Sequence, residues 1–298
     1  MLVNINYSKK LKNEKASNLI LFTNEKFNIN SLKKNISNSE IAYVSDLLKT
    51  NDTKKNLLTF EINSKKRIVL ISIKSNLKIS EIENLGAKFF SNTKQEKNNS
   101  EYFLISDTIA GGHNNFLGHF LHGVKLKSYE FNKYKSKKSN KLLNINIVGT
   151  KNIPSTKNQL KFKALEEGTF FTRDLVSEPG NILHPDEYAK RLSSLKKLGL
   201  KITIFDKKKL RNLGMHSLLG VGMGSVRGSY LVIMEWNGGK SSSNPLAFVG
   251  KGVTFDTGGY SLKPAKFMED MTYDMAGSAA VVGLMKTLAL RKAKINAV

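Results

Sequence analysis

Four of the charged side chains in one glycine-rich stretch, Val249 to Ala280, are of types that suit a divalent metal site. They are Lys251, Asp256, Lys263 and Asp274. Carboxylate oxygens are donors that divalent cations prefer, and the chain has no cysteine to offer sulfur. A lysine amine binds a metal only when neutral, so Lys251 needs a pKa lowered by burial and by the cation itself. A simple salt bridge between a lysine and an aspartate is the alternative interpretation of the same residues.

The sequence around these residues predicts a strand, a loop and a helix. Leu246 to Val249 is a short apolar run between a proline and a glycine, which predicts a buried strand. The glycines that follow, among them Gly258 and Gly259, allow turns and close backbone approach. From Asp274 onward apolar residues recur at three-to-four spacing, which predicts a helix. Charged groups at a strand end, in a glycine-rich loop and at a helix start are where α/β proteins place chemistry.

Three spaced elements of this stretch resemble motifs of the leucyl aminopeptidase (cytosol aminopeptidase) family. The family's VGKGxTFDxGG motif matches Val249 to Gly259, and its serine-x-lysine-proline segment matches Ser261 to Pro264. Its helix start DMxG, followed by serine or alanine and then alanine, matches Asp274 to Ala280. Looser matches lie upstream at Arg173 to Pro185, Leu213 to Ser225 and Tyr230 to Trp236. Several ordered elements over more than half of the chain are a more specific signal than one short motif.

The resemblance implies two divalent metal ions, Zn²⁺ or Mn²⁺, and a role for each charged residue. Lys251 matches a lysine that binds metal, Asp256 matches the carboxylate that bridges both metals, and Asp274 matches a ligand of one metal. Lys263 matches the family's catalytic lysine, which stays cationic. That lysine stabilises the oxyanion formed when metal-activated water attacks the scissile carbonyl.

Met268 and Met271 match positions with which the family lines the pocket for the substrate's first side chain. Since methionine also fills irregular gaps in cores, a packing role for both residues stays open. The function that the resemblance implies is that of a metalloaminopeptidase, a hydrolase that releases N-terminal amino acids, leucine by preference, from peptides. It also implies a homo-hexamer.

The chain is long enough for two domains, and alternating strand and helix patterns in both halves indicate an α/β protein. The 298 residues are 40% hydrophobic, enough for two cores. We expect an N-terminal α/β domain with a mixed sheet over residues 1–150, and an incomplete α/β/α sandwich as the catalytic domain over 151–298. No apolar run approaches the roughly 20 residues that span a bilayer, and the N-terminus lacks the apolar core of a signal peptide. We therefore expect no membrane contact and a cytoplasmic location.

The formal net charge of +24 allows a second class of function, nucleic-acid binding. The run Lys133 to Lys141, with Tyr129, Phe131 and Tyr134 nearby, could contact a phosphate backbone. However, nearly all of the basic residues are lysines, whereas specific nucleic-acid binders use arginine for bidentate contacts. A solvated connector between the domains is therefore the favoured interpretation of this run.

Two further patterns suggest sites that the sequence does not support. The GVGMGS segment, residues 220–225, has the wrong spacing for a dinucleotide loop and precedes a predicted strand instead of following one. His113, His119 and His122 are close enough in sequence to suggest a metal site, but no acidic residue stands beside them. We therefore expect packing or surface roles for these histidines.

The family's NTDAEGR segment, which carries two more acidic metal ligands and a catalytic arginine, has no counterpart in these residues. We therefore expect a C-terminally truncated chain that is inactive and aggregation-prone by itself. The alternative is a non-catalytic relative, either a pseudo-enzyme or a basic nucleic-acid-binding protein.

Overall fold

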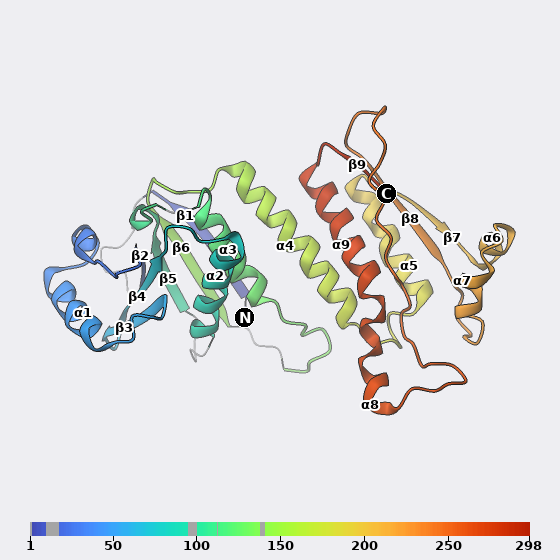
Figure 1. Cartoon of the computed structure of the whole chain (residues 1–298), viewed down its shortest axis with the longest axis horizontal. Coiled ribbons are helices and arrows are strands. Elements are labelled where there is room, and N and C mark those ends of the chain that lie inside the picture. Colours follow the sequence, from blue (N-terminus) through green and yellow to red (C-terminus); the bar gives the residue numbers. More distant parts are fainter. Residues whose placement is uncertain (1, 10–17, 95–99, 112, 138–140) are drawn as a thin grey trace. The chain divides into compact units, whose positions relative to one another are not determined.

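The computed structural model describes residues 2–9, 18–94, 100–111, 113–137 and 141–298. The chain divides into two compact units, Met1–Gln159 and Leu160–Val298. The division falls near the start of helix α4 (Thr156–Ser177), the longest helix drawn in Figure 1. The expected domain boundary at residue 150 lies just before that helix.

A six-stranded mixed sheet forms the centre of the first unit, in the order β1-β6-β5-β2-β4-β3. All neighbouring strands are parallel except β3 and β4, which are antiparallel. The strands are β1 (Leu2–Ser8), β2 (Asn18–Asn24), β3 (Leu57–Asn63), β4 (Lys66–Ile73), β5 (Ser100–Ile105) and β6 (Leu142–Val148). The central strands β2 and β4 are continuous apolar runs, as parallel strands covered on both faces must be.

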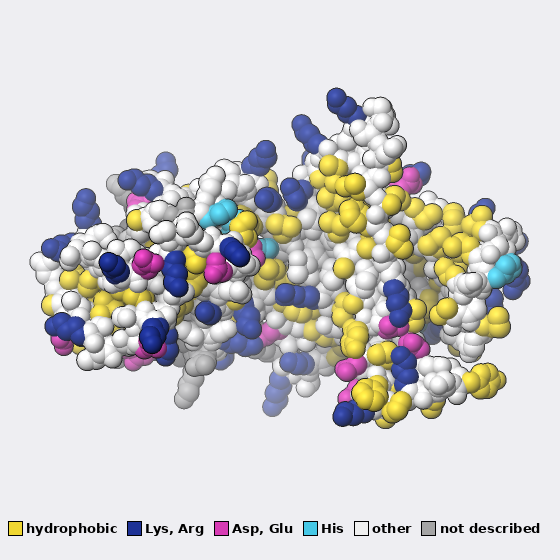
Figure 2. All heavy atoms as spheres, viewed as in Figure 1, with side chains coloured by type: hydrophobic (Ala, Val, Ile, Leu, Met, Phe, Trp, Pro, Cys, Tyr) yellow, Lys and Arg dark blue, Asp and Glu magenta, His cyan; other side chains and the backbone are white. Residues whose placement is uncertain are grey.

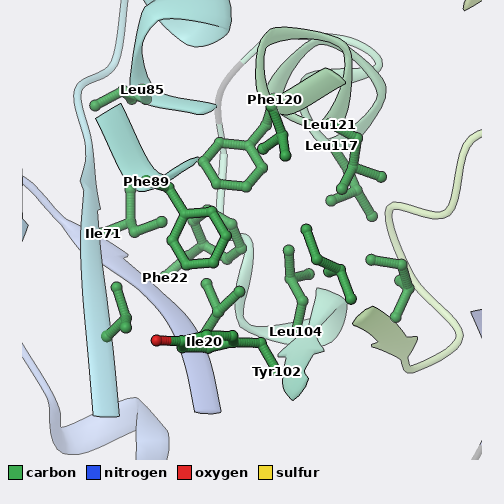
Figure 3. Packing of buried hydrophobic residues seen from close by; sticks show 14 of the residues in the cluster. Ile20, Phe22, Ile71, Leu85, Phe89, Tyr102, Leu104, Leu117, Phe120 and Leu121 are labelled. Carbon is green, nitrogen blue, oxygen red and sulfur yellow. The ribbon is translucent and has the colours of Figure 1, made fainter. Parts of the chain in front are cut away.

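Helices cover both faces of this sheet. Helices α2 (Ile79–Thr93) and α3 (Phe116–Ser128) pack on one face, where aromatic rings fill the core (Figure 3). Phe22 of β2 meets the Phe120 ring edge to face, with the ring centroids 5.6 Å apart. On the other face lie α1 (Asn38–Thr50) and the 3-10 helix η1 (Asn30–Lys34). The mixed α/β architecture predicted from the sequence is confirmed.

Helices α2 and α3 pack with their backbones in contact, because each has a glycine at the crossing. A Cβ atom added to Gly123 of α3 would overlap the carbonyl group of Glu83 in α2. A Cβ atom added to Gly86 of α2 would overlap the carbonyl group of Phe120 in α3. The helices therefore lie closer together than any side chain at either position allows.

The second unit combines a small antiparallel sheet with helices. Its strands, in sheet order, are β7 (Lys201–Phe205), β8 (Leu231–Asn237) and β9 (Asn296–Ala297). Helix α4, α5 (Pro185–Ser193) and α9 (Ala276–Arg291) pack with β7 and β8 in one hydrophobic cluster. The shorter helices are η2 (Ser106–Thr108) in the first unit, and η3 (Ser194–Leu198), α6 (Lys207–Asn212), α7 (His216–Val221), α8 (Ala265–Met268) and η4 (Glu269–Met275) in the second. This arrangement of helices and strands agrees with the predicted α/β class.

Residues 246–249 were predicted to form a buried strand, and the prediction of burial is wrong. The segment is extended, because Leu246 N donates to Asn296 O at 3.0 Å and Phe248 N donates to Val298 O at 2.8 Å. However, Leu246 is 55% exposed and Val249 is 97% exposed. The segment runs along the outer side of β9, where none of the described residues covers these two side chains.

Among the residues that the structure describes, no helix combines the length and apolar character needed to cross a membrane.

Replacing Gly123 with alanine should destabilise the first unit by about 3 kcal/mol, because helices α2 and α3 must separate to admit a methyl group. Urea unfolding followed by far-UV circular dichroism measures the loss. The single tryptophan, Trp236, lies in the second unit and provides an internal control, since its fluorescence transition should not move. Gly220→Ala is the matched substitution, because a Cβ atom there meets no atom within 4 Å. Equal destabilisation by both variants would contradict the prediction.

Candidate functional site

The structure brings the four charged residues of the glycine-rich stretch together as two ion pairs. Lys251 Nζ lies 2.7 Å from Asp274 Oδ1, and Lys263 Nζ lies 3.2 Å from Asp256 Oδ2. The pairs also act on each other, since the charges of Lys251 and Asp256 each affect the pKa of the other residue. The structure therefore gathers all four candidates into one cluster.

Lys251 reaches Asp274 because the backbone before it lies directly against the first turn of α9. A Cβ atom on Gly250 would be 2.5 Å from Ser278 Cα and 2.6 Å from Gly277 O. Ser278 N donates to Lys251 O at 2.9 Å across the same contact. Only glycine fits at position 250 without moving one of the two segments.

Asp256 and Lys263 are held by a loop that folds back on itself. Gly258 N donates to Asp256 Oδ1 at 2.8 Å, and Lys263 N donates to Thr257 O at 3.0 Å. Gly258 and Gly259 have φ angles of +89° and +71°, which glycine adopts without strain. The loop therefore returns the chain so that Lys263 lies beside Asp256.

The electrostatics of the cluster favour the anionic form of Asp256. The Gly258 N–H group and the Lys263 ammonium lower the pKa of Asp256. The hydrogen bond from Lys251 to Asp274 raises the pKa of Lys251. The expectation that burial lowers the pKa of Lys251 is therefore wrong, because its side chain is 59% exposed and faces a carboxylate. Only a bound cation could favour the neutral amine here.

One oxygen of the Asp274 carboxylate has no hydrogen-bond partner in the described structure. Its side chain is 15% exposed, and its Oδ2 atom is buried without a hydrogen-bond partner. A buried carboxylate oxygen without a partner is costly, and a metal ion is one group that can satisfy it. The donors here are two carboxylates and a lysine amine, which fit a divalent cation. The residues that the structure describes hold no cluster of three or more histidine, cysteine, aspartate or glutamate side chains suited to a metal.

Met271 lies beside the cluster, and Met268 precedes it by three residues in the chain. Met271 Sδ accepts a hydrogen bond from Lys263 Nζ at 3.2 Å. Met268 ends helix α8, and both side chains are half-buried. Neither belongs to the hydrophobic clusters of the two units, whereas the neighbouring Met275 is fully buried in one of them. Their place in a substrate pocket stays a prediction.

Sequence reasoning missed the residues that support the cluster from α5 and the turn before it. Arg191 of α5 donates to Glu178 Oε1 at 2.9 Å and fixes the turn that contains Gly180. A Cβ atom on Gly180 would lie 2.9 Å from the ring of Phe255, the neighbour of Asp256. The signal in the sequence is the Glu-Pro-Gly-Asn turn, but the sequence does not show what the turn contacts.

The histidines do not form part of a metal site in the described structure. His119 Nδ1 lies 3.3 Å from Glu83 Oε1, an acidic residue that the sequence does not place beside it. His122 is buried in α3. These positions agree with the packing roles expected for both residues.

Comparisons with known proteins point to one family. Residues 170–298 match the model of the cytosol aminopeptidase family, catalytic domain. A probable cytosol aminopeptidase of Ehrlichia ruminantium is 51% identical over 183 residues, which are 59% of this chain and 37% of that protein. The chain thus spans well under two thirds of the length of this curated relative.

Solved structures show the same fold at low sequence identity. A mutant of tomato leucine aminopeptidase superposes with a TM-score of 0.76 at 20% identity, over 99% of this chain and 61% of that one. The bottromycin maturation enzyme BotP in complex with Mn superposes with a TM-score of 0.71 at 21% identity, over 92% of this chain and 56% of that one. The segment that carries the cluster of lysines and aspartates is therefore the segment that matches the catalytic domain of the cytosol aminopeptidase family.

Proposed function

We propose that the protein is a metal-dependent aminopeptidase that removes N-terminal amino acids from peptides. One observation carries the proposal: Lys251, Asp256, Lys263 and Asp274 lie in one cluster within the segment that matches the family's catalytic domain. The peptide substrates, the leucine preference, the hexamer and the cytoplasmic location that the resemblance implies are parts of the same proposal. The names of the curated relatives support the cytoplasmic part.

In this proposal Lys251, Asp256 and Asp274 hold divalent metal, with Asp256 shared between two ions. The unpartnered Oδ2 atom of Asp274 and the ionised carboxylate of Asp256 support these roles. Zn²⁺ and Mn²⁺ are the candidate ions, and Mn in a structure of similar fold favours the second. Divalent ions in such sites polarise carbonyl groups and make water a better nucleophile.

Lys263 is proposed as the catalytic lysine and the methionines as part of the substrate pocket. The Lys263 ammonium is held by Asp256 and Met271, so its position is fixed before substrate arrives. An ammonium in such a place donates hydrogen bonds to the oxyanion that develops on the substrate carbonyl. Met268 and Met271, both half-buried, offer soft apolar surface to the first side chain of the peptide.

Nucleic-acid binding is not favoured. On the face shown in Figure 2, lysine and arginine side chains are scattered among acidic and polar ones instead of forming one stripe. Phe131 and Tyr134 are aromatic residues of a kind that stacks on bases, but here they pack against each other with ring centroids 5.8 Å apart. Part of the lysine-rich run, residues 138–140, lies outside the described residues.

Asp256→Ala should weaken Mn²⁺ binding to the 298-residue chain by more than about 100-fold, because a shared ligand is lost. Electron paramagnetic resonance of free Mn²⁺ during a titration measures the affinity. Asp270→Ala is the control, since that carboxylate is exposed on η4 and lies outside the cluster. Unchanged Mn²⁺ affinity in Asp256→Ala would refute the metal assignment.

In an active form of the protein, Lys263→Ala should lower kcat for a leucyl peptide by about 10²- to 10³-fold, as loss of an oxyanion donor does. Metal content, measured by mass spectrometry, should stay the same. Lys266→Ala removes an exposed lysine three residues away and should retain normal turnover. Full activity of the Lys263 variant would show that another residue stabilises the oxyanion.

The carboxyl group of Asp256 should titrate below its ordinary pKa of 3.8 in the metal-free chain. Because the folded pKa is depressed, the interactions of Asp256 contribute stability above pH 3.8, and this stability is lost as the pH falls through the lower folded pKa. Carbon-detected NMR of the Asp256 carboxyl group measures the titration. Lys263→Met should move the pKa back toward 3.8 only in part, since the Gly258 N–H group remains. A wild-type pKa at or above 3.8 would disprove this arrangement.

A further inference from the structure

Ser278, on the first turn of α9, connects the two segments that carry the Lys251–Asp274 ion pair. Its backbone N–H group donates to Lys251 O at 2.9 Å, and its hydroxyl donates to Met275 O at 2.8 Å. Lys251 is a candidate ligand, and Met275 directly follows the candidate ligand Asp274. Ser278 therefore fixes the backbone beside both members of the ion pair.

The hydroxyl of Tyr188 completes this connection from α5. Tyr188 Oη lies 3.0 Å from Ser278 Oγ. A serine hydroxyl has one hydrogen, and Ser278 gives it to Met275 O, so Tyr188 must be the donor in this contact. The hydrogen bonds thus run in one direction, from Tyr188 through Ser278 to the carbonyl of Met275.

Tyr188 is well suited to be a fixed donor. The residue is 5% exposed, and burial raises its pKa to about 12, although the bond to Ser278 acts in the opposite direction. The phenol therefore keeps its proton at neutral pH. Its helix is held in turn, since Arg191 of α5 donates to Glu187 and to Glu178, each at 2.9 Å.

We propose that Tyr188 and Ser278 are positioning residues whose hydroxyls hold Lys251 and Asp274 in the geometry that binds metal. The inference rests on the proposed metal site and adds two residues to it that carry no metal themselves. The family's motif admits serine or alanine at the position of Ser278, so the motif does not assign this hydroxyl a role. Removing it would leave the buried hydroxyl of Tyr188 without an acceptor.

The first experiment measures the metal-free chain. Amide hydrogen exchange at position 278, followed by NMR, reports how often the contact with Lys251 O opens. Tyr188→Phe and Ser278→Ala should speed this exchange about fivefold or more, with the larger effect for Ser278→Ala. The double variant should resemble Ser278→Ala alone, because both substitutions break one connected pair.

The second experiment measures Mn²⁺ affinity of the same variants by electron paramagnetic resonance. Tyr188→Phe and Ser278→Ala should each weaken binding about tenfold, as loss of an outer partner of a metal ligand does. The control is Thr287→Val, which removes a buried hydroxyl of α9 that lies 2.9 Å from Gly283 O in the same helix and 3.3 Å from Ala164 O in α4, away from the cluster. It should lower the melting temperature without changing exchange at position 278 or Mn²⁺ affinity.

The outcomes separate the two proposals. Unchanged exchange in Tyr188→Phe and Ser278→Ala, or equal changes in Thr287→Val, would overturn the positioning role. Faster exchange with unchanged Mn²⁺ affinity would also overturn it. A wild-type chain with no saturable Mn²⁺ binding would overturn the proposed metal site, while faster exchange in the two variants would still support their hold on Lys251.

Discussion

The close approach of residue 250 to the first turn of α9 is the contact on which the candidate site depends. Gly250 would place a Cβ atom 2.5 Å from Ser278 Cα, and the next residue accepts the Ser278 N–H bond. Any side chain at position 250 would push the two segments apart and separate Lys251 from Asp274. Backbone contact sets a distance that flexible side chains could not set by themselves.

The cluster contains two lysines and two aspartates, so its positive and negative side chains are equal in number. Each carboxylate is paired with an ammonium, so the Coulomb energy of bringing the two acids together is offset. The pairing does not use every oxygen, since Asp274 Oδ2 has no partner. Asp256 differs, because one oxygen accepts from Gly258 and the other faces Lys263. The ion pairs therefore hold the charged groups in place and leave one carboxylate oxygen, Asp274 Oδ2, without a partner. A site for a further positive charge requires such an oxygen.

Sequence patterns predicted the α/β class, helix α9 and the residues of the cluster, but not the contacts between distant segments. The central strands β2 and β4 are continuous apolar runs of the kind that sequence patterns reveal. Strand β1 and helix α1 carry a weaker signal, because only Val3 is buried in β1 and only Val44 in α1. The apolar run at residues 246–249 led to a wrong prediction of burial, because an apolar segment is buried only where another element covers it. The bond between Tyr188 and Ser278 joins residues 90 positions apart, and no local pattern can reveal it.

The packing of helix α9 within the second unit determines where Asp274 of the candidate site lies. Toward its C-terminal half it lies against α4 at two facing glycines, Gly168 and Gly283, where a side chain on either would overlap the other helix. Thr172 of α4 donates to Ala279 O at 3.0 Å, one residue beyond Ser278. The helix is thus fixed along its length by α4 and at its first turn by Tyr188, so it has little freedom to slide or rotate. Asp274 directly precedes this fixed helix, and its position is therefore set by helix packing and not by the exposed loop that contains Asp256 and Lys263.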